Sequence, residues 1–223
     1  MDIVRVFREA TPMLLQGIWM TFLLTIVSVS IATVLGLTSS LMGMSALKPF
    51  QWISGAYIKI IRGTPLIVQA FFIYFGLPQL IQSFGIDFRF SAFVGGAVTL
   101  SLNAGAYLSE IFRGGIQAVD PGQMEAARSL GLTKGRALYK IILPQALRII
   151  TPSLVNQIII SLKDTSIISV IAFPEIVYQA KIYMGRTMQS FATWTVVALF
   201  YLILITSLAT LSRRIEKRMN NAA

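Results

Sequence analysis

The sequence contains neither cysteine nor histidine among its 223 residues. The absence of cysteine excludes disulfides, thiolate metal sites and cysteine nucleophiles. The absence of histidine removes the commonest metal ligand and the commonest general base near neutral pH. We therefore predict that this chain has no metal site, no catalytic residues and no enzymatic activity.

Charged residues are also scarce. They make up 13% of the chain, whereas hydrophobic residues make up 55%; an ordinary soluble domain is about 25% charged. The mean hydropathy is +0.72, and the apolar residues form long blocks. This composition argues against a soluble globular domain, and it excludes a disordered chain, which would be poor in large aliphatic residues.

Five of the apolar blocks are long enough to cross a bilayer as helices, which takes about 20 residues each. The predicted spans are residues 16–41, 65–84, 91–112, 151–173 and 194–211. We therefore predict an all-α integral membrane protein with about five transmembrane helices, formed as a single membrane domain over residues 1–223.

The distribution of Lys and Arg predicts how these spans are oriented. Thirteen basic residues fall in the connections on one side of the membrane and five on the other. Because cytoplasmic loops carry the excess of positive charge, we expect the C-terminus to be cytoplasmic and the N-terminus outside. The net charge of +10 then reflects membrane topology, and no nucleic-acid partner is expected.

The longest connection, residues 113–150, has helix signals of its own. Asp120 is suited to capping a helix over 122–130, because Pro121 follows it at the first helical position. Gly131 can end that helix in the left-handed conformation, and Thr133 can cap a second helix. We expect two short helices joined by a glycine turn on the cytoplasmic face, the second closed or kinked at Pro144.

The same connection carries a spaced pattern, Glu125-Ala126-Ala127-x3-Gly131-x9-Ile141-x-Leu143-Pro144. It resembles the EAA motif of the membrane subunits of binding-protein-dependent ABC importers. Four further segments resemble the permeases of that group that import polar amino acids such as histidine, arginine, glutamine, glutamate and cystine. They are Arg62-Gly63-Thr64-Pro65, Asn103-x-Gly105-Ala106-Tyr107-x2-Glu110, Pro144-Gln145-Ala146 and Lys163-Asp164-Thr165-Ser166.

The resemblance implies a type I ABC importer-like fold in a bacterial cytoplasmic membrane, in contact with lipid. It implies a coupling helix near residues 123–135 that docks on a separate ATPase subunit. Glu125 would offer its carboxylate to that subunit, Ala126 and Ala127 would allow close approach, and Gly131 would make the turn. Leu143 and Pro144 complete the motif.

The resemblance also implies the other members of a complex. They are two cytoplasmic ATPase subunits, a second copy of this chain or a paralogue, and an extracellular or periplasmic substrate-binding protein. No phosphate-binding G-x-x-x-x-G-K-[ST] motif occurs in the sequence, so ATP and magnesium are expected on the ATPase partner and no cofactor on this chain.

A different class of function is also compatible with residues 125–142. The two alanines, the glycine turn and the basic second helix resemble a DNA-reading helix-turn-helix. A membrane-tethered DNA-binding protein is therefore the alternative. Attachment to spans at both ends argues against it, and the topology of the chain already accounts for the basic residues.

Polar residues inside the predicted spans are costly and therefore mark candidate substrate contacts. Seven-residue spacing places them in stripes on helix faces: Asn156 with Lys163, Gln157 with Asp164, and Asn103 with Glu110. Arg62 and Thr64 precede the second span, beside Pro65. Such groups suit a zwitterion, with a basic side chain for its carboxylate and an acidic one for its amino group.

Two alternatives remain open for these charged residues. Lys163 and Asp164 could instead join spans through buried ion pairs, which would leave substrate recognition to the external binding protein. Glu110 could pair with Arg113 at the cytoplasmic edge. The residues do not distinguish one polar amino acid from another, or a homodimer from a heterodimer.

Overall fold

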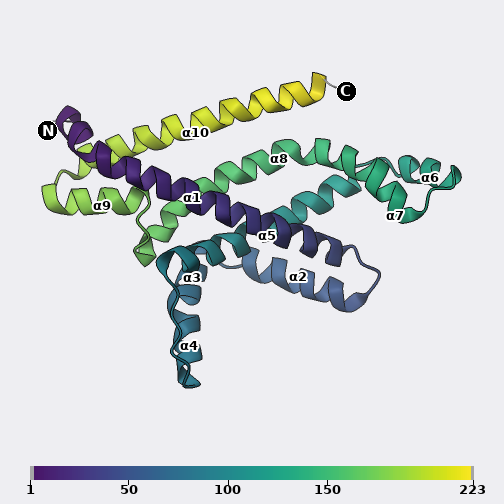
Figure 1. The fold of residues 1–223 in the computed structure, drawn as a ribbon, viewed down its shortest axis with the longest axis horizontal. Helices are drawn as coiled ribbons and strands as arrows, with labels where there is room; N and C mark the ends of the chain where they lie inside the picture. The colour runs from purple at the N-terminus through teal and green to yellow at the C-terminus, as the bar shows by residue number, and fades with distance from the viewer. Residues whose placement is uncertain (1–2, 222–223) are drawn as a thin grey trace.

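The computed structural model describes residues 3–221, with side chains through residue 214, and all regular elements in that part of the chain are helices (Figure 1). In chain order they are α1 (Ile3–Gly43), α2 (Lys48–Arg62), α3 (Leu66–Phe71), η1 (Phe72–Gly76), α4 (Leu77–Ser83), α5 (Ala92–Gln117), α6 (Pro121–Ser129), α7 (Lys134–Ala137), η2 (Leu138–Ile142), α8 (Leu143–Asp164), η3 (Thr165–Ile171), α9 (Ile176–Thr187) and α10 (Ser190–Asn221). Of the short elements, η1 and η2 are π turns and η3 is a 3-10 helix.

Within the described residues, four helical segments are long and apolar enough to cross a membrane: Ile3–Gly43, Leu66–Ser83, Lys134–Ile171 and Ser190–Arg214. They correspond to four of the five predicted spans. The remaining predicted span corresponds to α5, whose 26 residues rise about 39 Å but include five Gly, two Ser and one Asn. Fourteen residues of α5 are buried, so this helix faces protein more than lipid. The all-α membrane fold is confirmed.

Close packing of α1 against α5 forms the centre of the bundle. A Cβ placed on Gly36 would lie 2.7 Å from Leu108 Cβ, so only glycine allows α5 to approach this closely. Ser39 Oγ accepts a hydrogen bond from Ser109 Oγ at 3.1 Å, and Ser54 Oγ of α2 donates to the Ser39 carbonyl at 2.7 Å. In an apolar bilayer, helices associate through small residues that allow close packing and through hydrogen bonds between hydroxyl groups.

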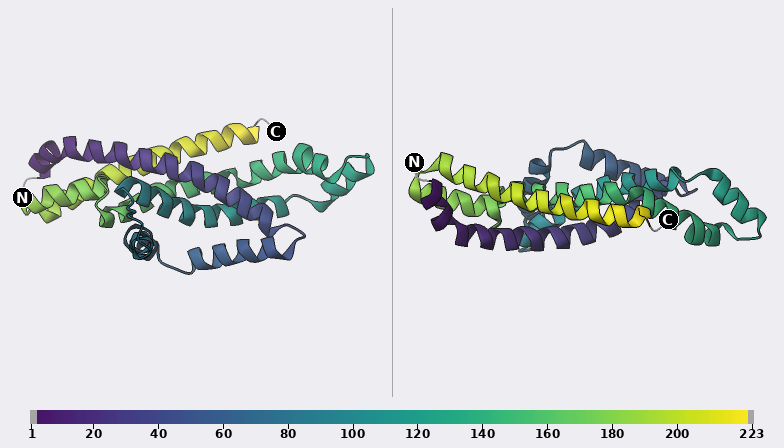
Figure 2. Two further views of the ribbon diagram at one scale, coloured as in Figure 1. Left: turned by 60° about the horizontal axis from the view of Figure 1, so that its bottom comes forward. Right: turned by 90° about the horizontal axis from the view of Figure 1, so that it is seen from above.

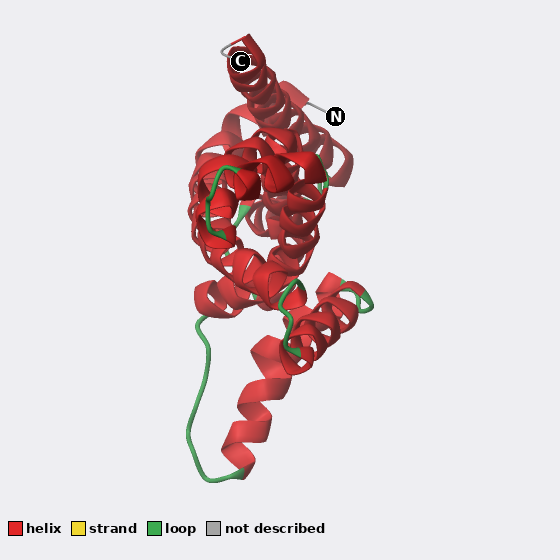
Figure 3. Cartoon of the chain, turned by 90° about the vertical axis from the view of Figure 1, so that its right-hand side faces the viewer, coloured by secondary structure: helices red, strands yellow, loops and turns green. Residues whose placement is uncertain are grey.

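The segment Leu66–Ser83, which comprises α3, η1 and α4, extends away from this bundle as a separate arm (Figures 1 and 3). The helix is interrupted before this segment at Gly63 and Thr64, and Pro65, which has no N–H of its own, is the N-cap of α3. Along the α3–α4 arm, large apolar side chains are exposed: Ile67, Val68, Phe71, Phe72, Phe75 and Leu80. This surface requires lipid or another protein chain to cover it.

Each π turn lies just before a proline. The Leu77 N–H donates to the Phe72 carbonyl and the Leu143 N–H to the Leu138 carbonyl, each five residues back, and a proline follows at the next position. Because proline has no N–H for the bond four residues back, the wider turn accommodates the gap. Of the two predicted alternatives, a second loop helix closed or kinked at Pro144, closure does not occur, because α7, η2, α8 and η3 form one continuous helical segment.

At the opposite end of the molecule, α9 packs between the first turns of α1 and the start of α10 (Figure 2). This cluster contains Val6, Ala10, Leu14, Ile176, Ala180, Tyr183, Ala192, Val196 and Val197. The 3-10 helix η3 leads into it, and Ala172 in the left-handed conformation, with φ of 61°, redirects the chain toward α9.

Glu175 caps α9 from a fully buried position, with 0% of its surface exposed. Its carboxylate accepts hydrogen bonds from the Val177 and Tyr178 N–H groups at 2.9 and 2.7 Å, and from the Tyr201 hydroxyl of α10 at 3.3 Å. Burial raises the pKa of Glu175 to about 7, although these hydrogen bonds and the nearby Lys181 oppose the rise. The buried carboxyl therefore ties the start of α9 to α10.

This pKa predicts a pH dependence of stability. The folded-state pKa of Glu175 lies above its ordinary value of 4.5, so its contribution is complete below pH 4.5 and is lost as the pH rises to about 7. The difference in unfolding free energy between wild type and Glu175→Gln should change by about 3 kcal/mol across that window. Thermal unfolding in detergent at several pH values measures it, and parallel pH profiles would contradict the assignment.

Candidate substrate cavity and coupling loop

A cavity of about 400 Å³ opens beside the break between α2 and α3, where α5, α8 and η3 meet this segment. Its lining consists of Thr64, Pro65, Leu66, Asn103, Tyr107, Gln157, Ile160, Asp164 and Ile167. Two side-chain amides, a hydroxyl, a phenol and one carboxyl therefore share a mainly apolar chamber. That is the composition expected of a small-molecule site, where a few polar groups fix the orientation of a ligand.

Four of the residues predicted for the substrate pathway lie together in this cavity: Thr64, Asn103, Gln157 and Asp164. They come from three separate segments of the chain. Gln157 and Asp164 lie on one face of α8, as their seven-residue spacing indicates. Gln157 and Asn103 are 6% and 8% exposed, so their amides are held inside the bundle.

Arg62 and Glu110 form an ion pair at the edge of the cavity. Glu110 also accepts a hydrogen bond from Arg113 at 3.1 Å, so the pairing with Arg113 that was left open in the sequence is present. The guanidinium of Arg62 lies 5.2 Å from the centroid of the Tyr107 ring, and Tyr107 lines the cavity. The cluster carries one net positive charge, since two guanidinium groups share one carboxylate.

Asn156 and Lys163 lie outside the cavity lining. Both are exposed on the surface of the single chain, because their stripe is turned by about 100° around α8 from that of Gln157 and Asp164. The ion pairs formed by the described residues all lie elsewhere. Among the described residues, Lys163 and Asp164 therefore do not form the buried ion pairs between spans that were the alternative to a role in substrate contact.

Sequence reasoning missed Gln69, which holds the break between α2 and α3 together. Its Nε2 donates to the Ile61 carbonyl at 2.7 Å, and to the Thr64 carbonyl and hydroxyl at 2.9 Å each. Its Oε1 accepts a hydrogen bond from Asn103 Nδ2 at 3.1 Å. One buried amide thus satisfies carbonyls left free by the break and fixes a cavity residue. The first amide in the apolar run that follows Pro65 was the available signal.

We predict that Gln69→Leu lowers the unfolding free energy by about 2–4 kcal/mol, because it leaves several buried polar groups without partners. It should also raise the KM for transport, since Thr64 and Asn103 lose their fixed positions. The exposed Gln79 of α4 offers a matched control, Gln79→Leu. Thermal unfolding and uptake kinetics measure both effects, and equal behaviour of the two variants would refute the role of Gln69.

The connection between α5 and α8 has the predicted helix caps. Asp120 accepts a hydrogen bond from the Gly122 N–H at 2.7 Å, and Gly131, just past the C-cap of α6, has a φ of +82°. The Gly131 N–H donates to the Arg128 carbonyl at 3.0 Å and the Leu132 N–H to the Ala127 carbonyl at 3.1 Å. This pair of bonds is the Schellman pattern, which requires a left-handed residue where glycine stands.

The motif residues in this loop point in different directions. Glu125 and Ala126 are exposed, whereas Ala127 is 1% exposed and packs inward. Ala127 therefore does not present its side chain to a partner from this surface. Leu130, which sequence reasoning treated only as the last residue of a helix, is 83% exposed beside the turn.

Leu143 and Pro144 lie away from that tip. They begin α8 directly after η2. Ile142 and Ala146 beside them pack with Val119, which follows α5, in a small apolar core that also includes Ile116, Met124, Leu138 and Ile141. This core holds the two loop helices together as one rigid unit.

The helix-turn-helix alternative does not fit this geometry. After the turn, α7 has only four residues before it continues through η2 into α8, a membrane span. A recognition helix must be free to enter the major groove of DNA. Here the corresponding helix is part of a membrane-crossing segment.

The sequence matches a family model described as the binding-protein-dependent transport system inner membrane component, over residues 32–221. The chain belongs to this family. Similar proteins include a probable glutamine ABC transporter permease protein, GlnM, of Bacillus subtilis, which is 38% identical over 98% of this chain and 99% of its own. The arginine transport system permease protein ArtQ of Bacillus subtilis and the glutamine transport system permease protein GlnP of Escherichia coli are each 36% identical over 94% of both chains.

Solved structures agree with this assignment. An amino acid ABC transporter with histidines has a chain that is 40% identical, with a TM-score of 0.89 over 98% of this chain and 99% of its own. The MetNI methionine ABC transporter shares the fold at a TM-score of 0.76, over 93% of this chain and 96% of its own, with 19% identity. The protein is thus a multi-pass inner-membrane permease of the amino acid ABC transporter group.

Proposed function

We propose that this chain is the membrane-spanning subunit of an ATP-driven importer, and that a polar amino acid crosses the membrane through the cavity around Asp164. The observation that carries the proposal is the convergence of Thr64, Asn103, Gln157 and Asp164 on one chamber in a permease fold. Glutamine and arginine permeases among its relatives support a polar amino acid as the substrate.

The groups in and beside the cavity suit the two ends of a zwitterion. Asp164 can accept hydrogen bonds from the α-amino group, and the amides of Asn103 and Gln157 can bond the carboxylate or a polar side chain. The cluster of Arg62, Glu110 and Arg113, with its net positive charge, favours the carboxylate at the Tyr107 side.

A second copy of this chain, or a paralogue, completes the pathway in this proposal. The stripe of Asn156 and Lys163 is exposed on α8, inside a segment that crosses the membrane, and lipid does not satisfy such groups. The apolar α3–α4 arm likewise extends beyond its own bundle. A partner permease placed against both surfaces would enclose the cavity between two chains.

The cytoplasmic loop is the proposed docking element for two ATPase subunits, which carry the ATP and magnesium. Leu130 supplies an exposed apolar contact, and Glu125 and Ala126 lie on the same short helix. The helical segment from Lys134 to Ile171 is continuous, so a rigid displacement of the loop reaches Asp164 directly. A substrate-binding protein delivers the amino acid outside, with the C-terminus of the chain in the cytoplasm.

Asp164→Asn tests the cavity. Loss of a charged hydrogen-bond acceptor costs about 1.5–3 kcal/mol, so the KM for uptake should rise roughly 10- to 100-fold with the protein still inserted. Asp87→Asn is the matched control, because the Asp87 side chain is 88% exposed outside the cavity. Uptake of labelled amino acids into membrane vesicles measures both. Unchanged kinetics in Asp164→Asn would contradict the assignment.

Leu130→Glu tests the docking element. A charge at an apolar contact should abolish co-purification of the ATPase and amino acid uptake, because the buried charge would have no partner. Leu47→Glu is the control, since Leu47 is 59% exposed in the connection between α1 and α2. Gly131→Ala should weaken coupling more mildly, through strain at positive φ. Full ATPase association in Leu130→Glu would overturn the proposal.

A further inference from the structure

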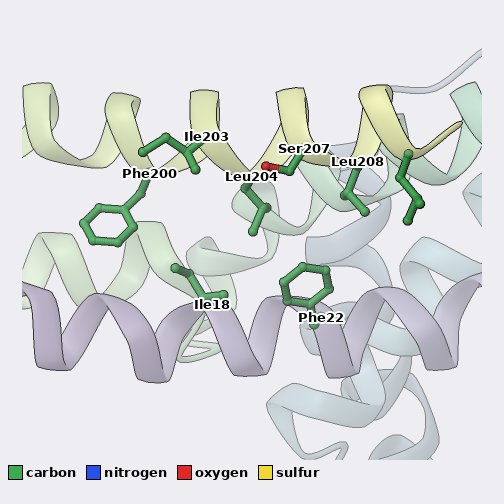
Figure 4. A pocket seen from close by; sticks show the side chains of 8 residues that line it. Ile18, Phe22, Phe200, Ile203, Leu204, Ser207 and Leu208 are labelled. Carbon is green, nitrogen blue, oxygen red and sulfur yellow. The ribbon is translucent and has the colours of Figure 1, made fainter. Parts of the chain in front are cut away.

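A groove runs between α1 and α10 on the outside of the bundle (Figure 4). The rings of Phe7 and Phe200 stack with their centroids 5.8 Å apart, and the two helices separate beyond this contact. Ile18 and Phe22 of α1 form one wall, and α10 forms the other, over a volume of about 380 Å³. Ser207 supplies the one polar side chain among the described lining residues.

The length of the groove corresponds to one leaflet of a bilayer. Its α10 wall runs from Phe200 to Leu211, a rise of about 16 Å along a helix. Half of the hydrocarbon core of a membrane is about 15 Å thick. The groove therefore lies along the direction in which an acyl chain of a single leaflet extends.

The shape of the groove suits a single hydrocarbon chain. Its volume of about 380 Å³ extends along about 16 Å of helix. A single hydrocarbon chain, whose atoms pack at about 4 Å, fits between the two walls.

A charge pair marks one end of the groove. Arg213 and Arg214 follow Leu211 after Ser212, and both are exposed. They stand where the apolar run of α10 gives way to charged residues. Guanidinium groups at this depth are suited to bidentate hydrogen bonding with a phosphate.

We propose that the groove between α1 and α10 binds one anionic phospholipid. Its acyl chain lies between Phe22 and Ser207, and its phosphate pairs with Arg213 and Arg214. The lipid fills the space left where the two helices diverge, and so supports α10 against the bundle. This inference concerns the lipid-facing side of the chain and does not depend on the substrate cavity.

The test is lipid retention by the purified complex. The full chain, with the subunits that accompany it, is delipidated in detergent and titrated with phosphatidylglycerol or phosphatidylcholine, and native mass spectrometry counts bound lipid. We expect phosphatidylglycerol to be preferred at least tenfold. The double variant Arg213→Gln, Arg214→Gln should remove that preference, while Lys48→Gln, Lys59→Gln, which loses the same charge at other exposed positions, should keep it.

A second variant tests the groove itself. Ser207→Trp fills the space between the helices and should reduce binding of both lipids, with the arginines intact. Equal phosphatidylglycerol retention in wild type and in both the arginine and tryptophan variants would overturn the proposal. So would efficient disulfide crosslinking between two copies of Ser207→Cys in native membranes, because the natural chain has no cysteine and such a crosslink would place a second copy over the groove.

Discussion

The shape of the cavity depends on how the backbone polar groups are hydrogen-bonded at the break between α2 and α3. A bilayer offers no water to free N–H and C=O groups, so irregular backbone is tolerated only when the protein itself supplies partners. Here the break between Arg62 and Leu66 is satisfied by the amide of Gln69. Because the same amide also accepts a hydrogen bond from Asn103, one side chain both satisfies the backbone carbonyls at the break and positions a residue of the cavity.

A second constraint links this cavity to the loop between α5 and α8. The π turn at Leu138–Ile142 allows the helix to pass Pro144 without interruption, so the loop unit and the wall of the cavity belong to one helical segment. The Schellman turn at Gly131 and the small apolar core around Ile142 make the loop itself rigid. The path from the loop to Gln157 and Asp164 is therefore one helical segment, which also contains Pro152 inside α8.

Close approach of α1 and α5 provides the frame in which both features operate. Gly36 and the serines of α1 and α5 stand where a water-soluble core would have large apolar side chains. In a bilayer, moving such side chains from lipid into the protein gives no hydrophobic stabilisation. Helix α10 meets α1 near the start of both helices, in the cluster that includes Val6 and Val196 and at the stacked rings of Phe7 and Phe200. The space beyond that contact is the groove to which we assign a lipid.

Local chemistry in the sequence predicted the features that depend on a few neighbouring residues. The cap at Asp120, the left-handed turn at Gly131 and the shared face of Gln157 and Asp164 follow from spacing and residue type. The membrane spans follow from apolar length, although α5 does not match the lipid-facing composition that the other four share. A central helix meets protein on most sides, so its sequence need not be strongly apolar.

Features that depend on tertiary contacts were not predicted. Two stripes on α8 lie about 100° apart, and nothing in the sequence states which one faces the cavity and which faces outward. The role of Gln69 depends on carbonyls that an unbroken helix would have satisfied. Ala127 packs inward and Leu130 outward because of how α6 lies on the loop core, which the motif alone does not specify.

The most direct test of the central claim uses the absence of natural cysteine. Ile160 lines the cavity and Ile158 does not, yet the two are 38% and 39% exposed. In the complex reconstituted with its ATPase, we predict that a transported amino acid slows alkylation of Ile160→Cys. We also predict that ATP with vanadate changes the rate of this alkylation. Ile158→Cys should show no protection by the amino acid. Equal responses at both positions would contradict a substrate pathway through this cavity.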